Sequence, residues 1–106
     1  METLLTYRIY VCVPADIVDS FIEAVSPHIP SFLGQYDHVC WWSEAGTEQY
    51  RHIKSDQIEQ KPSCRVEMSL PHDDDILHNF INKIVIPNHP WKEPVITIGE
   101  QKIVKH

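Results

Sequence analysis

The first part of the chain alternates between apolar and polar side chains, which is the pattern of a strand with one buried face. This pattern predicts a strand over residues 6–13, which Pro14 ends. Asp16 then opens a predicted helix, because a carboxylate is favourable beside the free N–H groups of a first helical turn. The prolines of residues 26–30 end this helix. Its apolar face collects Ile17, Val18, Phe21, Ile22 and Val25.

A second part of the chain repeats this arrangement. Residues 64–70 alternate in the same way and predict another strand, interrupted by Pro71. Residues 73–75 are three consecutive aspartates, which suit the first turn of a helix. The apolar stripe of this second helix has the same spacing as the first and consists of Ile76, Leu77, Phe80, Ile81 and Ile84. The repeat indicates two βαβ halves.

Each predicted helix is followed by a predicted strand, over residues 34–42 in the first half and 95–99 in the second. Between the halves, residues 46–53 predict an added strand, and the polar residues 54–61 follow it. Two βαβ halves with both helices on one sheet face form an α+β fold, the ferredoxin-like βαβ-βαβ sandwich, here with an extra strand or hairpin between the halves. We expect a single domain over residues 1–106.

The two helices cover only one face of such a sheet, and one tryptophan is predicted to lie on the other face. In the strand predicted over residues 34–42, alternation separates Asp37, Val39 and Trp41 from His38, Cys40 and Trp42. A tryptophan left in water is unfavourable, so either a loop covers this face or a second copy of the chain does. We favour the second explanation, which predicts a homo-oligomer.

Composition limits the partners and the location. The chain has nine Lys and Arg against fifteen Asp and Glu, a net charge of −6, and the basic residues are scattered. Binding to nucleic acid or to an anionic membrane requires clustered cations, so neither is expected. No apolar run approaches the ~18 residues that span a bilayer, and the N-terminus does not resemble a signal peptide. With three widely spaced cysteines and no disulfide framework, these features predict a cytoplasmic protein.

The sequence contains no catalytic signature. Its three glycines, Gly34, Gly46 and Gly99, cannot form a dinucleotide-binding or phosphate-binding loop, and no nucleophile elbow or zinc-protease motif is present. We therefore expect a protein that is not an enzyme, since an enzymatic role would rest only on analogy with the fold.

Seven histidines suggest a divalent metal as the one cofactor to consider. The densest cluster offers His72, Asp75 and His78, the last two spaced to share one face of a helix. Stabilisation of the helix dipole by the aspartates explains the same cluster without a metal.

A second candidate site is the loop of residues 89–94, where two prolines fix a short connection. This loop presents an imidazole, an indole and a carboxylate from His89, Trp91 and Glu93, a combination suited to binding a ligand. The alternative is a rigid connector whose Trp91 packs against a neighbouring subunit.

Several segments together resemble one known family. Residues 34–37 (GQYD) are similar to a G-N-Y-D-type strand start, residues 65–67 (RVE) to an R-I-E strand, and residues 89–94 (HPWKEP) to an H-P-Y-E-E-P loop. Residues 10–14 and the helix after them are similar in layout. These features resemble the inserted CutA-like domain of the Nif-three-like (NGG-one-interacting factor three) family, over nearly the whole chain.

The resemblance implies a ferredoxin-like fold of the CutA and PII kind, in which related domains form trimers through sheet edges and faces. It places the family's dinuclear metal ligands in a larger flanking domain, so metal-dependent hydrolysis is not expected of this segment. The favoured function is a non-catalytic homo-oligomeric binding or regulatory module, as a trimer. A ligand would lie in the cleft between subunits, lined by His89, Trp91, Glu93, Tyr36, Asp37 and His38. The alternative function is a divalent-metal-binding protein of the CutA type.

Overall fold

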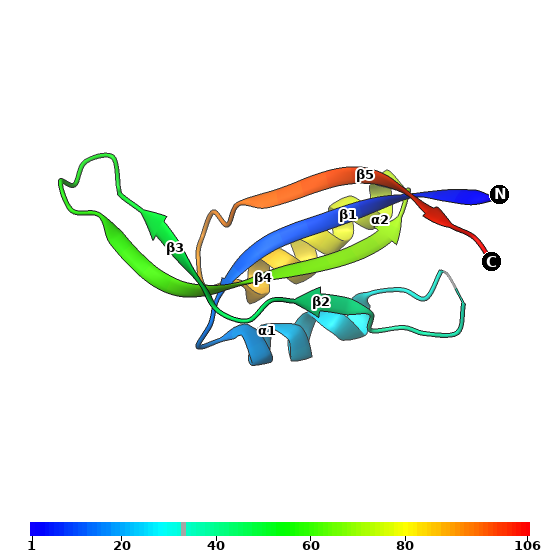
Figure 1. The fold of residues 1–106 in the computed structure, drawn as a ribbon, viewed down its shortest axis with the longest axis horizontal. Helices are drawn as coiled ribbons and strands as arrows, with labels where there is room; N and C mark the ends of the chain where they lie inside the picture. Colours follow the sequence, from blue (N-terminus) through cyan, green and yellow to red (C-terminus); the bar gives the residue numbers. More distant parts are fainter. Residues whose placement is uncertain (33) are drawn as a thin grey trace.

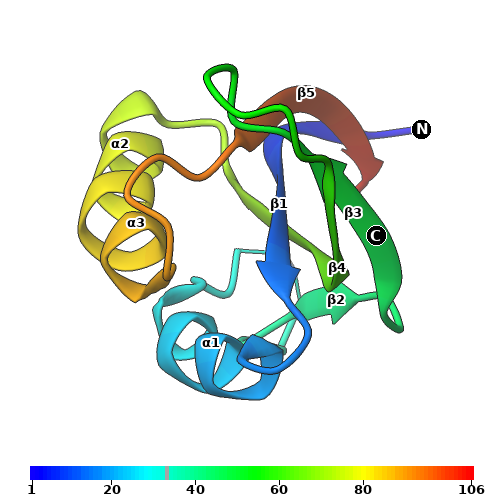
Figure 2. The same ribbon diagram turned by 90° about the vertical axis from the view of Figure 1, so that its left-hand side faces the viewer.

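The computed structural model describes residues 1–32 and 34–106 and consists of two layers, a five-stranded sheet and the helices that cover one of its faces (Figures 1 and 2). The strands are β1 (Thr3–Pro14), β2 (Cys40–Trp42), β3 (Gly46–Tyr50), β4 (Glu59–Pro71) and β5 (Ile96–Val104). The helical segments are α1 (Val18–Val25), η1 (Ser26–His28), α2 (Asp74–Phe80), η2 (Ile81–Val85) and α3 (Ile86–Asn88). No helix within the described ranges is long and apolar enough to cross a membrane.

The sheet has the strand order β2-β4-β1-β5, and β3 pairs with the same strand β4 as β2 does. All of these pairs are antiparallel. Because β1 and β2 are both antiparallel to β4, they run parallel to each other, as a βαβ unit requires. The same relation holds for β4 and β5, which are both antiparallel to β1. The predicted ferredoxin-like α+β fold with two βαβ halves is confirmed, as is the extra hairpin between them.

The core lies between the helices and the inner face of the two central strands. In the β1–β4 register Ile9 lies opposite Met68 and Val11 opposite Val66, and all four side chains are buried. The helices complete the core with Phe21, Val25, Leu77 and Phe80. Each side chain of this size contributes roughly 1.5–3 kcal/mol to stability when it is fully buried.

The second helix departs from its predicted stripe because it contains a π turn. Asp73 caps the helix, since its Oδ1 accepts a hydrogen bond from the Ile76 N–H over 3.0 Å. Over η2 the hydrogen bonds span five residues, as from the Ile86 N–H to the Ile81 carbonyl. The wider turn rotates later side chains relative to an α-helix. Val85 is therefore fully buried, and the predicted core residue Ile84 is only partly buried.

The start of the first helix also differs slightly from its prediction. Helix α1 begins at Val18, and Ile17 occupies the cap position without a side-chain cap. Asp19, rather than the predicted Asp16, places its carboxylate in the first turn, where it interacts favourably with the helix dipole.

The strand predicted over residues 34–42 is wrong for most of its length, because β2 includes only its last three residues. Gly34 and His38 have φ angles of 71° and 59°, in the left-handed region. An extended strand cannot pass through such residues, so the chain between them forms an exposed loop. The predicted alternation of faces therefore applies to Cys40, Trp41 and Trp42 but not to residues 37–39.

Strands β3 and β4 form a hairpin that projects beyond the helical layer (Figure 1). The predicted added strand ends at Tyr50 instead of at residue 53, whereas β4 begins earlier than predicted, at Glu59. The hairpin accounts for the elongated shape of the molecule, whose principal extents are 52 × 25 × 24 Å.

The π turn yields a stability prediction. Val85→Ala should lower the free energy of unfolding by about 2 kcal/mol, because two methyl groups are removed from a fully buried site. Ile84→Ala should cost less, although it removes more atoms. Urea unfolding followed by circular dichroism measures both. A larger loss for Ile84→Ala would contradict the π turn and restore the uninterrupted stripe.

Candidate functional site

The sheet face opposite the helices carries one exposed tryptophan, as the sequence predicts. Trp41 lies opposite Glu67, whose side chain points to this outer face, and Trp42 lies opposite the core residue Val66. Side chains directly opposite in an antiparallel pair lie on the same face of the sheet. Trp41 is 51% exposed on the outer face, and Trp42 is 42% exposed on the other face. No loop covers Trp41 in the described chain.

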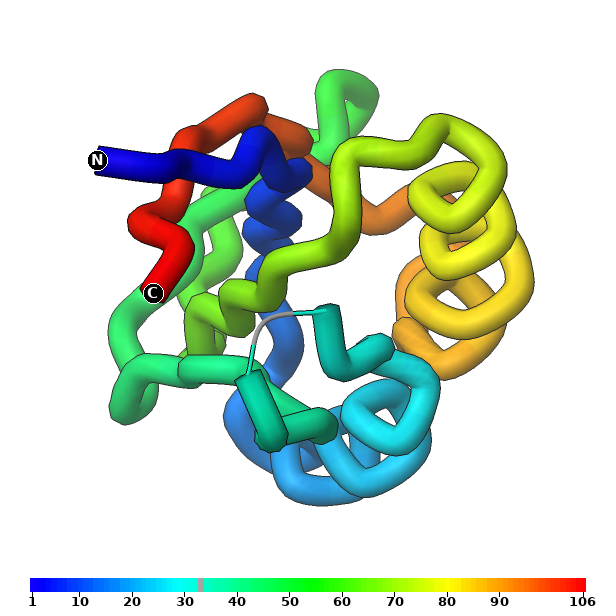
Figure 3. Tube along the Cα trace, turned by 90° about the vertical axis from the view of Figure 1, so that its right-hand side faces the viewer, coloured from blue at the N-terminus to red at the C-terminus, as the bar shows by residue number. Residues whose placement is uncertain are grey.

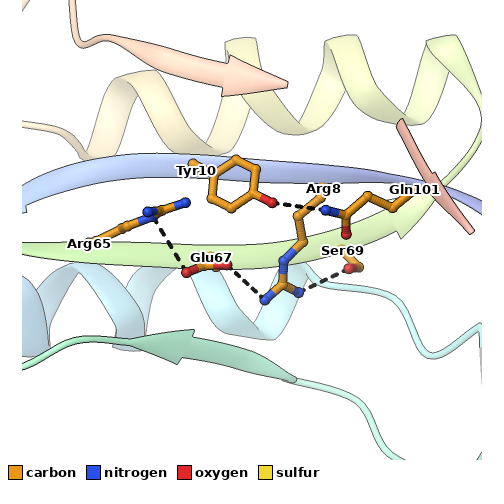
Figure 4. Close-up of polar contacts among 6 residues, drawn as sticks. All are labelled: Arg8, Tyr10, Arg65, Glu67, Ser69 and Gln101. Carbon is orange, nitrogen blue, oxygen red and sulfur yellow. Dashed lines mark hydrogen bonds and ion pairs between the residues drawn. The ribbon is translucent and has the colours of Figure 1, made fainter. Parts of the chain in front are cut away.

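A connected set of polar side chains crosses the outer face next to Trp41 (Figure 4). Arg8 donates to the Ser69 hydroxyl over 3.0 Å and forms an ion pair with Glu67 at 3.3 Å. The other carboxylate oxygen of Glu67 lies 3.5 Å from Nε of Arg65. The carboxylate therefore holds two arginines, from two different strands, in fixed positions. Several charges linked in one network stabilise a surface more than an isolated ion pair does.

The network continues to β5 through an aromatic ring. The Arg65 guanidinium lies 4.6 Å from the centroid of the Tyr10 ring, a cation–π contact. Gln101 donates to the Tyr10 hydroxyl over 3.0 Å, which fixes the orientation of the ring (Figure 4). The sequence signal for these residues was the outward position in each alternating strand, which indicated a polar face but no particular site.

A pocket of about 510 Å³ lies on this face, beside the part of β4 that pairs with β3. Its walls come from β1, β3, β4 and β5 together with the connection between α3 and β5. We refer to it as the Trp91 pocket. The lining side chains considered below are Tyr10, Cys12, Glu48, Arg65, Trp91 and Val95. Of these, only Trp91 was a predicted site residue.

The predicted site residue His89 anchors its loop and does not face the pocket. It is 7% exposed, and its Nδ1 accepts a hydrogen bond from the backbone N–H of Trp91 over 3.1 Å. The proton is therefore on Nε2, which donates to the carbonyl of Cys12 over 2.9 Å. The ring also contacts Phe21 edge-on, at 6.2 Å between centroids. Both ring nitrogens therefore have hydrogen-bond partners within the protein.

This anchor places Trp91 on the outer side of the sheet. The Trp91 ring packs edge-on against Tyr50 of β3, with centroids 6.0 Å apart, and against His89 at 5.4 Å. The loop therefore connects the buried helical layer to the outer face around the end of β1. Glu93, the third predicted residue of the loop, is exposed and does not line the pocket.

Cys12 is the one exposed thiol among the three free cysteines. Its partial burial and the nearby Glu48 carboxylate raise the pKa of the thiol, while the Arg65 guanidinium acts in the opposite direction. A thiol held protonated is a poor nucleophile. Cys12 therefore forms a small, neutral part of the pocket wall.

The other three predicted ligand residues lie apart from the loop of residues 89–94. Tyr36, Asp37 and His38 belong to the exposed loop before β2, which lies well apart from the loop of residues 89–94 along the long axis (Figure 1). Residues 34–38 lie toward the viewer in the end-on view of Figure 3. The His38 Nδ1 lies 2.8 Å from Asp37 Oδ1, and Tyr36 lines a separate pocket of about 190 Å³. One copy of the chain does not bring the two predicted groups together.

The predicted metal ligands do not form a ligand set in one chain. His72 stacks on Tyr7, with centroids 4.3 Å apart, and its Nε2 lies 2.8 Å from Glu100 Oε1. Asp75 lies in the first turn of α2 and His78 in its last turn. Throughout residues 1–32 and 34–106, no three His, Cys, Asp or Glu side chains are grouped closely enough to hold a metal ion. The residues of a single chain therefore do not fit a resident metal.

Comparisons with solved structures identify the fold. The chain is similar to a protein from Bacillus cereus related to NIF3, with a TM-score of 0.78 and 20% identity, over 95% of this chain and 27% of that one. It is also similar to CutA1 from Shewanella sp. SIB1, with a TM-score of 0.67 and 16% identity, over 89% of this chain and 78% of the other.

A third similar structure is the divalent ion tolerance protein CutA1 from Ehrlichia chaffeensis, with a TM-score of 0.62 and 16% identity, over 95% of this chain and 84% of that one. No protein-family model and no curated protein sequence matches the chain. These likenesses establish the NIF3-like and CutA-like fold predicted from the sequence. The chain spans about a quarter of the Bacillus cereus protein, so they establish the fold alone.

The Tyr7–Asp74 contact yields a prediction on alkaline stability. The Asp74 carboxylate accepts a hydrogen bond from the Tyr7 phenol and raises its pKa from 10.0 to about 12. The folded state therefore holds this proton more tightly than the unfolded state, and the resulting stability is present below pH 10 and lost as the pH rises toward 12. Tyr7→Phe should lose less stability across that interval than the unsubstituted protein does, as measured by urea unfolding.

Tyr36→Phe serves as the control, because Tyr36 is 78% exposed. This variant should follow the unsubstituted protein at every pH. If Tyr7→Phe also follows it, Tyr7 does not hold its proton in the manner inferred.

Proposed function

We propose that this protein is a non-catalytic homo-oligomeric module that binds a ligand or regulates a partner. The observation that carries this proposal is the position of Trp41, half exposed on a sheet face that no helix covers. A large aromatic side chain beside a fixed charged network is typical of an interface between protein subunits. Burial against another copy of the chain removes the indole from water.

The free edges of the sheet support the same proposal. Strands β2 and β5 end the hydrogen-bonded order of the sheet, so each presents unpaired backbone groups along one side. A contact between two unlike surfaces of one chain produces a closed ring when the rotation between copies permits it. We propose that three copies form such a ring, as the resemblance to CutA-like domains implies.

A ring also explains how the two groups of predicted ligand residues could act together. Within one copy, the loop before β2 and the loop of residues 89–94 lie well apart along the long axis (Figure 1). A head-to-tail contact places one end of a subunit against the opposite end of its neighbour. The proposed ligand therefore lies in the Trp91 pocket of one subunit, with Tyr36, Asp37 and His38 contributed by the next.

The chemistry of the pocket favours binding over catalysis. His89 is the residue of the loop best suited to transfer a proton, but both of its ring nitrogens already have partners. The Cys12 thiol, whose pKa is raised, is unsuited to nucleophilic attack. A cytoplasmic location and the absence of nucleic-acid partners remain predictions from composition.

The assembly is tested by substituting the two neighbouring tryptophans separately. Trp41→Ser should shift native mass spectra from trimer to monomer, because it removes the apolar centre of the proposed interface. Trp42→Ser is the matched control, since it makes the same change on the other face of the same strand, and it should remain trimeric. A monomeric unsubstituted protein would overturn the proposal, as would trimers that persist in Trp41→Ser.

A second candidate function is the binding of a divalent metal, as predicted for a CutA-type protein. The similar CutA1 from Ehrlichia chaffeensis is described as a divalent ion tolerance protein. The His72–Glu100 pair beside the aspartates of α2 provides an imidazole and carboxylates at one surface. Because one chain does not supply three grouped ligands, this proposal requires donors from a neighbouring subunit.

Metal binding is tested by dialysing the protein against micromolar zinc and measuring the retained metal by mass spectrometry. The metal proposal predicts stoichiometric zinc that decreases below pH about 6, where protons compete for imidazole. His72→Ala should lose the metal, and His52→Ala, an exposed histidine outside the cluster, should retain it. Absence of retained zinc in the unsubstituted protein would eliminate this function.

A further inference from the structure

The Trp91 pocket contains two side chains of opposite charge that form no ion pair with each other. Glu48 of β3 and Arg65 of β4 both line it, but none of the ion pairs within residues 1–32 and 34–106 joins them. Both groups lie close enough to Cys12 to shift the pKa of its thiol, in opposite directions. Cys12 therefore lies in the field of a carboxylate and a guanidinium that do not neutralise one another by direct contact.

The Glu48 carboxylate is free to bind a ligand because Lys61, the cation opposite it, contacts another side chain. Lys61 lies directly opposite Glu48 in the β3–β4 register, where a cross-strand ion pair is expected. Instead, the Lys61 ammonium lies over the Tyr50 ring, 5.8 Å from its centroid. None of the ion pairs within the described residues includes Glu48. The carboxylate is half-buried at the pocket wall and has no direct ion-pair partner among the described residues.

The Arg65 guanidinium is held in position but keeps terminal N–H groups that could bind a ligand. Its Nε faces Glu67 at 3.5 Å, and the group stacks over the Tyr10 ring at 4.6 Å. Its terminal nitrogens extend away from Glu67 toward Tyr10 (Figure 4). A guanidinium held in one plane with free terminal N–H groups is suited to bind a carboxylate through two parallel hydrogen bonds.

The rest of the pocket is apolar and partly rigid. The Trp91 indole is fixed by the anchored His89 and by Tyr50, and Val95 lies beside it. A volume of about 510 Å³ is within the range of small-molecule sites, which combine apolar walls with a few polar groups. The pocket thus offers an anionic group, a cationic group and an aromatic wall.

We propose that the Trp91 pocket binds a small zwitterion with an apolar body, the chemical class of the apolar α-amino acids. The ligand's ammonium pairs with Glu48, its carboxylate pairs with Arg65, and its side chain packs against Trp91. This inference rests on the proposed binding function, because it names the ligand class of that same site.

The charge balance distinguishes this class from others. A simple amine satisfies Glu48 but leaves Arg65 without an anion, and a simple carboxylate does the reverse. A neutral aromatic molecule satisfies neither charge and must displace water from both. A polyphosphate meets one arginine and is repelled by Glu48, so a nucleotide fits poorly. Only a ligand with both charges compensates both side chains.

The ligand class is tested with L-phenylalanine and two analogues of nearly the same shape. Phenethylamine lacks the carboxylate, and 3-phenylpropionate lacks the ammonium. Isothermal titration of the intact protein should give saturable binding of L-phenylalanine and at least about tenfold weaker binding of each analogue, because each loses one charge-assisted contact.

Two substitutions assign each contact to its residue. Glu48→Gln should abolish the preference for L-phenylalanine over 3-phenylpropionate and keep the preference over phenethylamine. Arg65→Gln should do the reverse, with circular dichroism showing that the protein remains folded. Glu44→Gln, an exposed carboxylate that does not line the pocket, is the matched control and should bind as the unsubstituted protein does.

The outcomes separate this inference from the function on which it rests. Equal affinity for all three molecules would overturn the zwitterion and indicate an apolar pocket only. No binding of L-phenylalanine by a trimer that depends on Trp41 would overturn the ligand class and leave the homo-oligomeric module standing. A monomer that binds L-phenylalanine with the expected preferences would support the ligand class and overturn the assembly.

Discussion

The pairing of β1 with β4 is the constraint on which the rest of the molecule depends. Its register decides which side chains face the helices and which face outward, because neighbouring residues of a strand point to opposite faces. A slip of β1 by one residue against β4 would place Arg8 in the core and expose Ile9. The same register therefore creates the apolar core and the polar outer network.

His89 joins these two faces into one structure. Its ring is buried beside Phe21 of the helical layer, while its hydrogen bonds reach the backbone of β1 and of Trp91. A neutral imidazole suits this position, because it provides one donor and one acceptor at fixed angles. The position of Trp91 on the outer face is thus determined by a contact made in the core. His89, a predicted ligand-binding residue, therefore positions the loop. The charged side chains of the pocket, Glu48 and Arg65, come instead from strands β3 and β4.

Much of the fold could be predicted from local patterns. Alternation identified β1 and β4, and helical spacing identified α1 and α2, because burial of one face imposes these periods on any sequence. The prediction was wrong where a single residue changed the backbone. The φ of 59° at His38 ends the strand expected before Cys40, and the π turn moves burial from Ile84 to Val85. Neither feature has a periodic signal, since each depends on how the segment packs against the rest of the chain.

For the candidate site too, some features follow from the sequence and others only from the tertiary structure. The sequence by itself determined the sandwich and the uncovered tryptophan, both of which follow from patterns within short segments. Only the tertiary structure decided that Glu48, Arg65 and Trp91 line one pocket, because they come from separate segments whose contact depends on strand register and on the path of a loop around the end of β1. Local sequence carries the periodicity that burial requires, but it does not carry the distances between segments that packing alone establishes.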